Sequence, residues 1–134
     1  LGLRQELEHK ARELGHDVRS FGAMTPEAYD YPDAADLVCA EVLAGRAELG
    51  VLVCGSGIGI SIRANRRPGI RAANCCSAEM AELARQHNHA NVLALGERLV
   101  ERSQGVAIFE AFLAGEPDQG ERHLRRVEKL DGPC

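Results

Sequence analysis

The sequence has no tryptophan, and aromatic residues make up only 4% of its 134 residues. Alanine, valine, leucine and isoleucine must therefore build most of the core. No apolar run is long enough to form a membrane-spanning helix, so a membrane is not an expected partner. The sequence also lacks a Cys-x-x-Cys pair, which argues against a structural zinc site.

Charge and cysteine content exclude two further classes of protein. The net charge of −4 argues against nucleic acid as the main partner. The five cysteines are odd in number, and Cys75 and Cys76 are adjacent, which makes a poor disulfide framework. This usage fits a reducing cytoplasm. The length is that of one domain, covering residues 1–134, with enough chain to bury a substantial core.

The most informative stretch is 49–62, where a short apolar run leads into glycines at alternate positions, Gly55, Gly57 and Gly59. The pattern predicts a buried strand, a tight turn and the start of a helix, an arrangement whose backbone N–H groups can bind an anion. Cys54 is the last residue of the predicted strand, and the nearby helix start should favour its thiolate form. The alternative is that Cys54 is a small buried hydrophobic residue beside an ordinary turn.

Segments with strand and helix patterns alternate along the chain. This alternation predicts a three-layer α/β/α, Rossmann-like parallel sheet with right-handed crossovers. The predicted strands cover 16–21, 49–54, 70–74 and 92–95. The predicted helices cover 1–14, 34–44, a segment from Ile58, 77–86, a segment through Val106 to Gly115, and a basic C-terminal helix at 121–130.

Ligands of such sheets bind beyond the carboxyl ends of the strands. Cys54, Tyr31 and Arg98 each lie at or just past the end of a predicted strand and are candidates for that edge. His87 and Asn88 instead precede the last strand. They would reach the same site only from the opposite edge or from a second subunit.

The residues alone allow three interpretations of His87: a base, a partner of its own helix dipole, or a metal ligand. It could act as a base for a Cys54 nucleophile, or it could simply interact with the C-terminal dipole of its own helix. A metal site built from Cys75, Cys76, His87 and His89 matches no zinc spacing, so no metal is expected.

The last predicted helix carries a basic cluster of Arg122, Arg125 and Arg126 with His123. Arg122 and Arg126 are four residues apart and share a helix face, which suits a phosphate group. The alternative is a solvated helix whose arginines pair with its own acidic residues.

Several motifs together resemble one family. They lie at 30–32, 53–61, 69–72, 85–93 and 120–123, and they closely resemble ribose-5-phosphate isomerase B from residue 1 to about residue 130. The family also contains allose-6-phosphate isomerase and the subunits of galactose-6-phosphate isomerase. One branch has serine at the position of Cys54 and a catalytic glutamate at the position of Ile58, so this chain falls in the cysteine branch.

The resemblance implies an aldose–ketose isomerase that needs no metal or cofactor. Cys54 would move a proton between the first two carbons of the open-chain sugar, His87 would open the furanose ring, and Ser56 would help protons move between the oxygens. The family is dimeric, with sites at the subunit interface, or tetrameric. The remaining implied contacts are the backbone of Gly55, Gly57, Ile58 and Gly59 to the enediolate, Tyr31 and Asn88 to the sugar, and Arg98, Arg122 and Arg126 to the phosphate.

The family also opens with a strand ending in Asp-His, which would precede Leu1. With it the sheet would have about five strands, and the first would lie between those at 16–21 and 49–54. We therefore expect these 134 residues to be a truncated form that is poorly folded and inactive without that strand.

Alternative functions are isomerisation of allose 6-phosphate or galactose 6-phosphate, the latter as one subunit of an isomerase, and non-catalytic binding of a phosphosugar.

Overall fold

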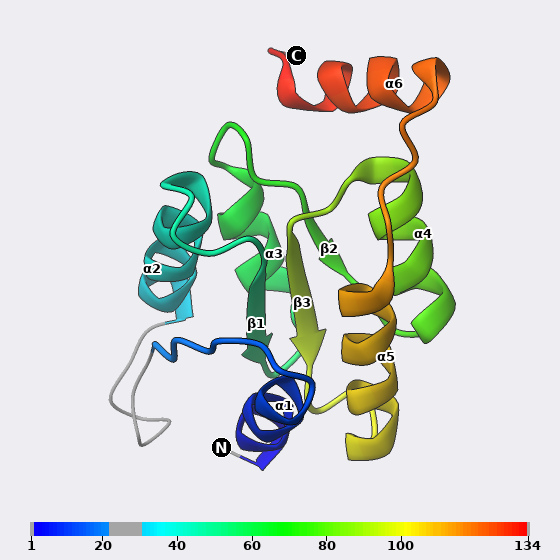
Figure 1. Cartoon of the computed structure of the whole chain (residues 1–134). Helices are drawn as coiled ribbons and strands as arrows, with labels where there is room; N and C mark the ends of the chain where they lie inside the picture. Colours follow the sequence, from blue (N-terminus) through cyan, green and yellow to red (C-terminus); the bar gives the residue numbers. More distant parts are fainter. Residues whose placement is uncertain (1, 22–30, 134) are drawn as a thin grey trace.

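Three parallel strands form the centre of the computed structural model, which describes residues 2–21 and 31–133 (Figure 1). The helices and strands, in chain order, are α1 (Gly2–Glu13), α2 (Tyr31–Leu43), β1 (Gly50–Cys54), α3 (Ile58–Asn65), β2 (Ala72–Asn74), α4 (Ala78–Asn88), β3 (Val92–Gly96), α5 (Arg102–Ala114) and α6 (Glu121–Asp131).

The sheet has the order β1-β3-β2 and is parallel throughout. Gly50 lies opposite Val92 and Cys54 opposite Gly96, so β1 and β3 end level with each other. The central strand β3 is buried along its whole length. Its continuous apolar run is typical of a strand covered on both faces.

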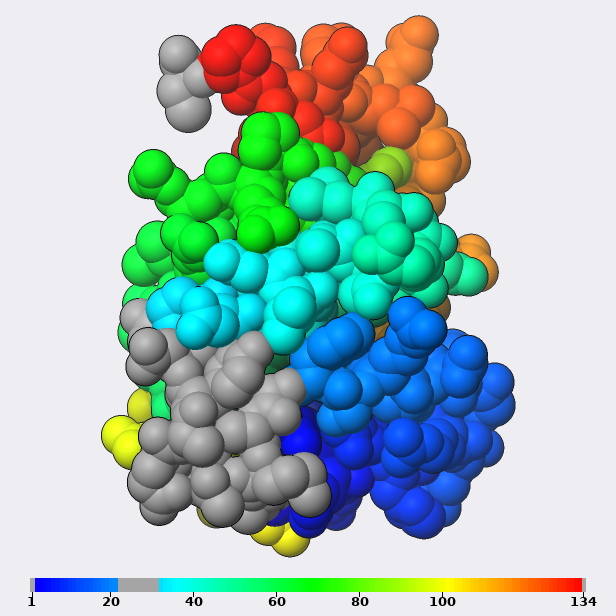
Figure 2. Space-filling model, turned by 90° about the vertical axis from the view of Figure 1, so that its left-hand side faces the viewer, coloured from blue at the N-terminus to red at the C-terminus, as the bar shows by residue number. Residues whose placement is uncertain are grey.

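Alternate side chains of β3 enter two separate cores. Leu93 and Leu95 pack with α1, α4 and α5 on one face of the sheet, whereas Val92 and Ala94 pack with α2 and α3 on the other. This is the predicted three-layer α/β/α fold. α6 lies outside the layers, at the end of the molecule where the strands begin, and α1 lies towards the other end (Figures 1 and 2).

Most predicted elements are confirmed within a few residues. Ser77 caps α4 by accepting a hydrogen bond from the Met80 N–H at 3.1 Å, and Gly15 follows α1 with a φ of 88°. None of the helices in residues 2–21 and 31–133 is long and apolar enough to cross a membrane.

Three predicted details are wrong. Residues 16–21 form no strand, because no strand among the described residues lies beside them to share a ladder. The α2 helix begins at Tyr31 instead of 34, since Pro32 is compatible with a first helical turn. Leu14 is 52% exposed, because α1 ends at Glu13 and the next residue leaves the buried face.

A groove runs along the free side of β1. The hydrogen bonds of Gly50 and Cys54 point to β3, so the backbone groups of Val51 and Val53, which alternate with them, point away from it. Both valines line a cavity of about 1030 Å³ that lies between β1, α1, α2 and residues 16–21. Among the described residues the backbone groups of Val51 and Val53 on this side have no partner, so the groove suits one more extended segment.

We predict that adding an apolar extended segment before Leu1 stabilises the chain by filling this groove. Pairing the Val51 and Val53 backbone groups should contribute about 1–3 kcal/mol per satisfied group, which would raise the unfolding temperature by roughly 5 °C or more. Circular dichroism on both versions measures the shift. A glycine-serine segment of equal length serves as the control, and equal unfolding temperatures for all three versions would contradict the prediction.

Candidate active site

The turn between β1 and α3 places a thiol beside the backbone N–H groups that begin a helix. Cys54 is the last residue of β1 and is partly exposed. Gly57 follows with a φ of 78°, in the left-handed region, and a Cβ there would lie 2.5 Å from Asn74 Oδ1. The Ile58 N–H donates to Ser56 Oγ at 3.2 Å. The Gly59 N–H, also in the first turn of α3, has no partner within that helix.

The residues after β3 hold this turn from the other side. The Glu97 N–H donates to the Cys54 carbonyl at 2.9 Å, and the Arg98 N–H donates to the Gly55 carbonyl at 3.0 Å. A Cβ on Gly96 would overlap the Ser56 carbonyl group, so the two backbones approach as closely as glycine permits. The first residues beyond β1 and β3 are therefore fixed against each other.

These two segments enclose a cavity of about 370 Å³ lined by Cys54, Gly55, Ser56, Gly59, Arg98 and Leu99. Arg98 is exposed, and its side chain lies over Gly55, where a Cβ would be 3.5 Å from its Cδ. A thiol, backbone donors at a helix start and a guanidinium thus share one cavity. This combination suits an anionic ligand that reacts next to the thiol.

Sequence reasoning missed Asn74, which supports the turn. It ends β2, and its Nδ2 donates to the Ser56 carbonyl at 3.5 Å while its Oδ1 fills the space beside Gly57. The only signal in the sequence was its place at the end of a predicted strand. It was not singled out because an asparagine at a strand end is common in turns.

Two of the other described cysteines, Cys39 and Cys75, are buried. Burial raises the pKa of the Cys75 thiol to about 11, with a further contribution from Cys76, and burial also raises the pKa of Cys39. Both buried thiols stay protonated near neutral pH. Within residues 2–21 and 31–133, no group of histidine, cysteine and carboxylate side chains could hold a metal ion.

The remaining candidates gather at the opposite edge of the sheet. His87 and Asn88 are the last residues of α4 and are exposed. Arg122 and Arg126 are exposed on α6, which packs against the same end of α4. Tyr31 is the first residue of α2, but its side chain lies outside the described part of the structure.

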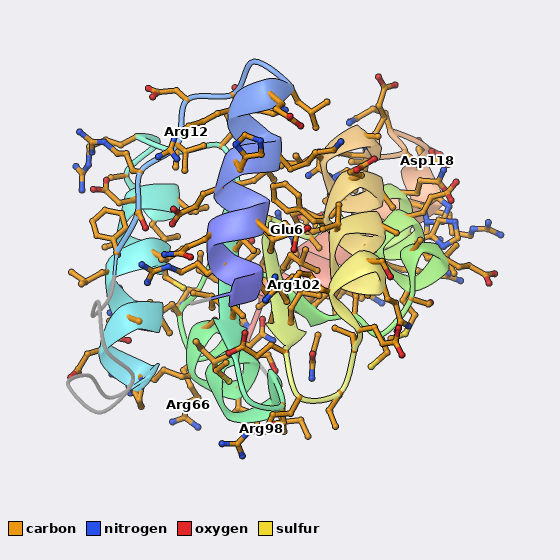
Figure 3. The ribbon with its side chains drawn as sticks, turned by 90° about the horizontal axis from the view of Figure 1, so that it is seen from below. Glu6, Arg12, Arg66, Arg98, Arg102 and Asp118 are labelled. Carbon is orange, nitrogen blue, oxygen red and sulfur yellow. The ribbon has the colours of Figure 1, made fainter. Side chains whose placement is uncertain are left out.

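Within one chain, the Cys54 cavity does not meet the second group of candidates, which is His87, Asn88, Arg122 and Arg126. The Asn91 carbonyl, just before β3, accepts a hydrogen bond from Gly50 at the start of β1, whereas Cys54 lies at the end of β1. Five residues of strand separate these ends by about 13 Å, far beyond hydrogen-bond reach. Figure 3 shows Arg98 projecting outward, well apart from Asp118, which lies beside the second group. Cys54 and His87 of the same chain therefore cannot act as a nucleophile and its base.

The family model described as Ribose/Galactose Isomerase matches residues 1–130. The chain belongs to this family. It is 41% identical over 128 residues to ribose-5-phosphate isomerase B of Escherichia coli, covering 96% of this chain and 85% of that protein. It is 33% identical over 129 residues to ribose-5-phosphate isomerase B of Mycobacterium tuberculosis, covering 96% of this chain and 80% of that protein.

Solved structures of family members share the fold. The Clostridium thermocellum ribose-5-phosphate isomerase B matches with a TM-score of 0.93 and 42% identity, over 97% of this chain and 87% of that chain. The Thermotoga maritima ribose 5-phosphate isomerase matches with a TM-score of 0.92 and 42% identity, over 97% of this chain and 89% of that chain. The Rossmann-like parallel sheet is therefore the fold of the family.

We predict that Gly96→Ala disables the cavity while Gly132→Ala does not. The added Cβ at Gly96 overlaps the Ser56 carbonyl, so the turn must move and the donors lose their positions, whereas at Gly132 the nearest atom is 3.5 Å away. Binding of inorganic phosphate, measured by calorimetry, should weaken about tenfold or more only in the first variant, which loses roughly 1.4 kcal/mol. Equal affinities in both variants would contradict the prediction.

Proposed function

We propose that the chain interconverts ribose 5-phosphate and ribulose 5-phosphate by proton transfer between the first two carbons of the open-chain sugar. The observation that carries this proposal is the cavity shared by Cys54, the glycine turn and Arg98. Membership of the ribose/galactose isomerase family supports the same reaction. Isomerisation of this kind needs a base beside the substrate and donors aimed at the oxygen that becomes charged.

Cys54 is the proposed base. As a thiolate it takes the proton from the second carbon of the aldose, which leaves an enediolate, and returns it to the first carbon to give the ketose. Its partial exposure lets substrate reach the sulfur, unlike the buried Cys39 and Cys75.

The glycine turn is the proposed stabiliser of the enediolate. The backbone N–H groups of the segment from Gly55 to Gly59 supply donors that are fixed before substrate binds, which is the most effective way to stabilise developing charge. The Ile58 N–H, which donates to Ser56 Oγ in the free chain, would be shared with the substrate. The Ser56 hydroxyl, already accepting from Ile58, keeps its own proton to pass between the two sugar oxygens. No metal or cofactor is required for these steps.

A second copy of the chain is the proposed source of the remaining groups. His87 for ring opening, Asn88 for the sugar, and Arg122 and Arg126 for the phosphate lie at the other end of the same chain, so a partner must bring them to Cys54. Apolar side chains beside the cavity favour such a contact: Ile58, Ile62 and Leu99 are 53%, 61% and 62% exposed. The proposed assembly is a homodimer, or a tetramer built from such dimers.

Arg98 and Tyr31 complete the proposed site from the first copy, Arg98 at the phosphate and Tyr31 at the sugar. The four described cysteines are free, which fits the reducing cytoplasm as the compartment.

Comparing kcat/KM for ribose 5-phosphate, allose 6-phosphate and galactose 6-phosphate tests which sugar phosphate is the substrate. Measured on the version that carries an apolar extended segment before Leu1, turnover of a six-carbon sugar alone, or of none, would contradict the proposed activity.

Cys54→Ala should abolish isomerisation and leave folding intact, because the loss of a general base typically lowers the rate by about 10²–10⁴-fold. A coupled assay of ribose 5-phosphate conversion measures the loss. Cys76→Ala is the matched control, since Cys76 is exposed and lies outside the cavity. A Cys54→Ala variant with activity within a few-fold of the parent would remove this thiol from the mechanism.

A further inference from the structure

The exposed ring of His87 lies against a second imidazole that the proposed chemistry does not use. The rings of His87 and His123 stack with their centroids 4.6 Å apart and an interplanar angle of 10°. His123 comes from α6 and is only 8% exposed, whereas His87 at the end of α4 is exposed. The buried His123 ring therefore supports the exposed His87 ring from one side.

Asp118 lies beside the His123 ring and makes four contacts. Its backbone N–H donates to the Gln86 carbonyl at 2.8 Å, and its carbonyl accepts from His89 Nε2 at 2.7 Å. Its Oδ1 accepts from the Gly120 N–H at 2.7 Å, and its Oδ2 lies 3.6 Å from His123 Nε2. The backbone of Asp118 therefore holds the end of α4, while its carboxylate contacts the start of α6 and faces the His123 ring.

The carboxylate is held in its charged form. The hydrogen bond from the Gly120 N–H lowers the pKa of Asp118, and the nearby His123, His87 and Arg122 lower it further. A negative charge 3.6 Å from Nε2 of His123 favours the ring orientation in which this nitrogen faces Asp118. This restricts the rotation of the ring and so the plane on which His87 rests.

We propose that His123, held by Asp118, is a positioning residue that orients the His87 imidazole for ring opening. The inference rests on the proposed role of His87. Within the described residues, neither ring nitrogen of His87 makes a hydrogen bond or an ion pair, so both remain available to a ligand. Stacking alone fixes the ring plane, and an error of about 1 Å in such a group can cost about 10²-fold in rate.

The same contact links ring opening to phosphate binding. Arg122 immediately precedes His123 on α6, and Arg126 lies one turn further along. The far end of α6 is held by Arg71, whose Nη1 lies 2.7 Å from Asp131 Oδ2. A phosphate bound by these arginines holds α6 in place, and with it the ring that supports His87.

Two substitutions at His123 separate stacking from space filling. His123→Phe keeps a flat ring, whereas His123→Leu keeps apolar bulk without one. We expect His123→Leu to lower kcat on ribose 5-phosphate by about 10–100-fold with KM nearly unchanged, and His123→Phe to stay within a few-fold of the parent. Leu124→Ala, an exposed neighbour on α6, is the control and should match the parent.

A four-carbon aldose 4-phosphate tests the step at which His123 acts. Its phosphate occupies the oxygen that would close a furanose ring, so it needs no ring opening. His123→Leu should convert it at close to the parent rate. Equal losses on both substrates, or equal losses for the Leu and Phe variants, would overturn the proposal.

A spectroscopic readout keeps this test independent of the proposed function. In the free protein, the ring C–H resonances of His87 carry the ring-current shift of its stacking partner. The shift should persist in His123→Phe and disappear in His123→Leu, and an unchanged shift in the Leu variant would also overturn the proposal. A parent protein that shows the stack but converts neither substrate would instead refute the isomerase function.

Discussion

The close approach of two backbones, the turn after β1 and the end of β3, is the constraint on which the cavity depends. Gly96 leaves just enough room for the Ser56 carbonyl, and two hydrogen bonds from Glu97 and Arg98 tie the segments together. Asn74 closes the third side from β2. Because backbone atoms set this geometry, the donors keep their positions whether or not a ligand is bound, which is the arrangement that stabilises developing charge best.

Much of the fold and most of the cavity lining were predictable from local patterns. The apolar run ending at Cys54, the alternate glycines and Ser77 as a helix cap each act within a few residues, so the sequence carries their full physical cause. Residues 16–21 have strand-like composition, but a strand needs a neighbour, and composition cannot supply one. Asn74 and Gly96 were missed because their importance comes from contacts with a turn far away in the sequence.

The position of His87 was predicted better than its surroundings. Its place before β3 put it at the opposite edge from Cys54, as the structure has it. Its stack on His123 joins residues 36 positions apart across a loop, and no spacing rule predicts such a contact. In the sequence His123 is part of a basic cluster. In the structure its ring is buried on the inner side of α6, whereas the arginines are exposed.

The proposed function assigns a base to one end of the chain and a proton donor and arginines to the other, and so it requires two copies for one complete site. Mixing two inactive variants, Cys54→Ala and His87→Ala, tests this directly. After joint unfolding and refolding in equal amounts, half of the dimers should be mixed, each with one intact site of two, so about a quarter of the parent activity should return. Activity no higher than the mean of the two separate variants would contradict a site shared between copies.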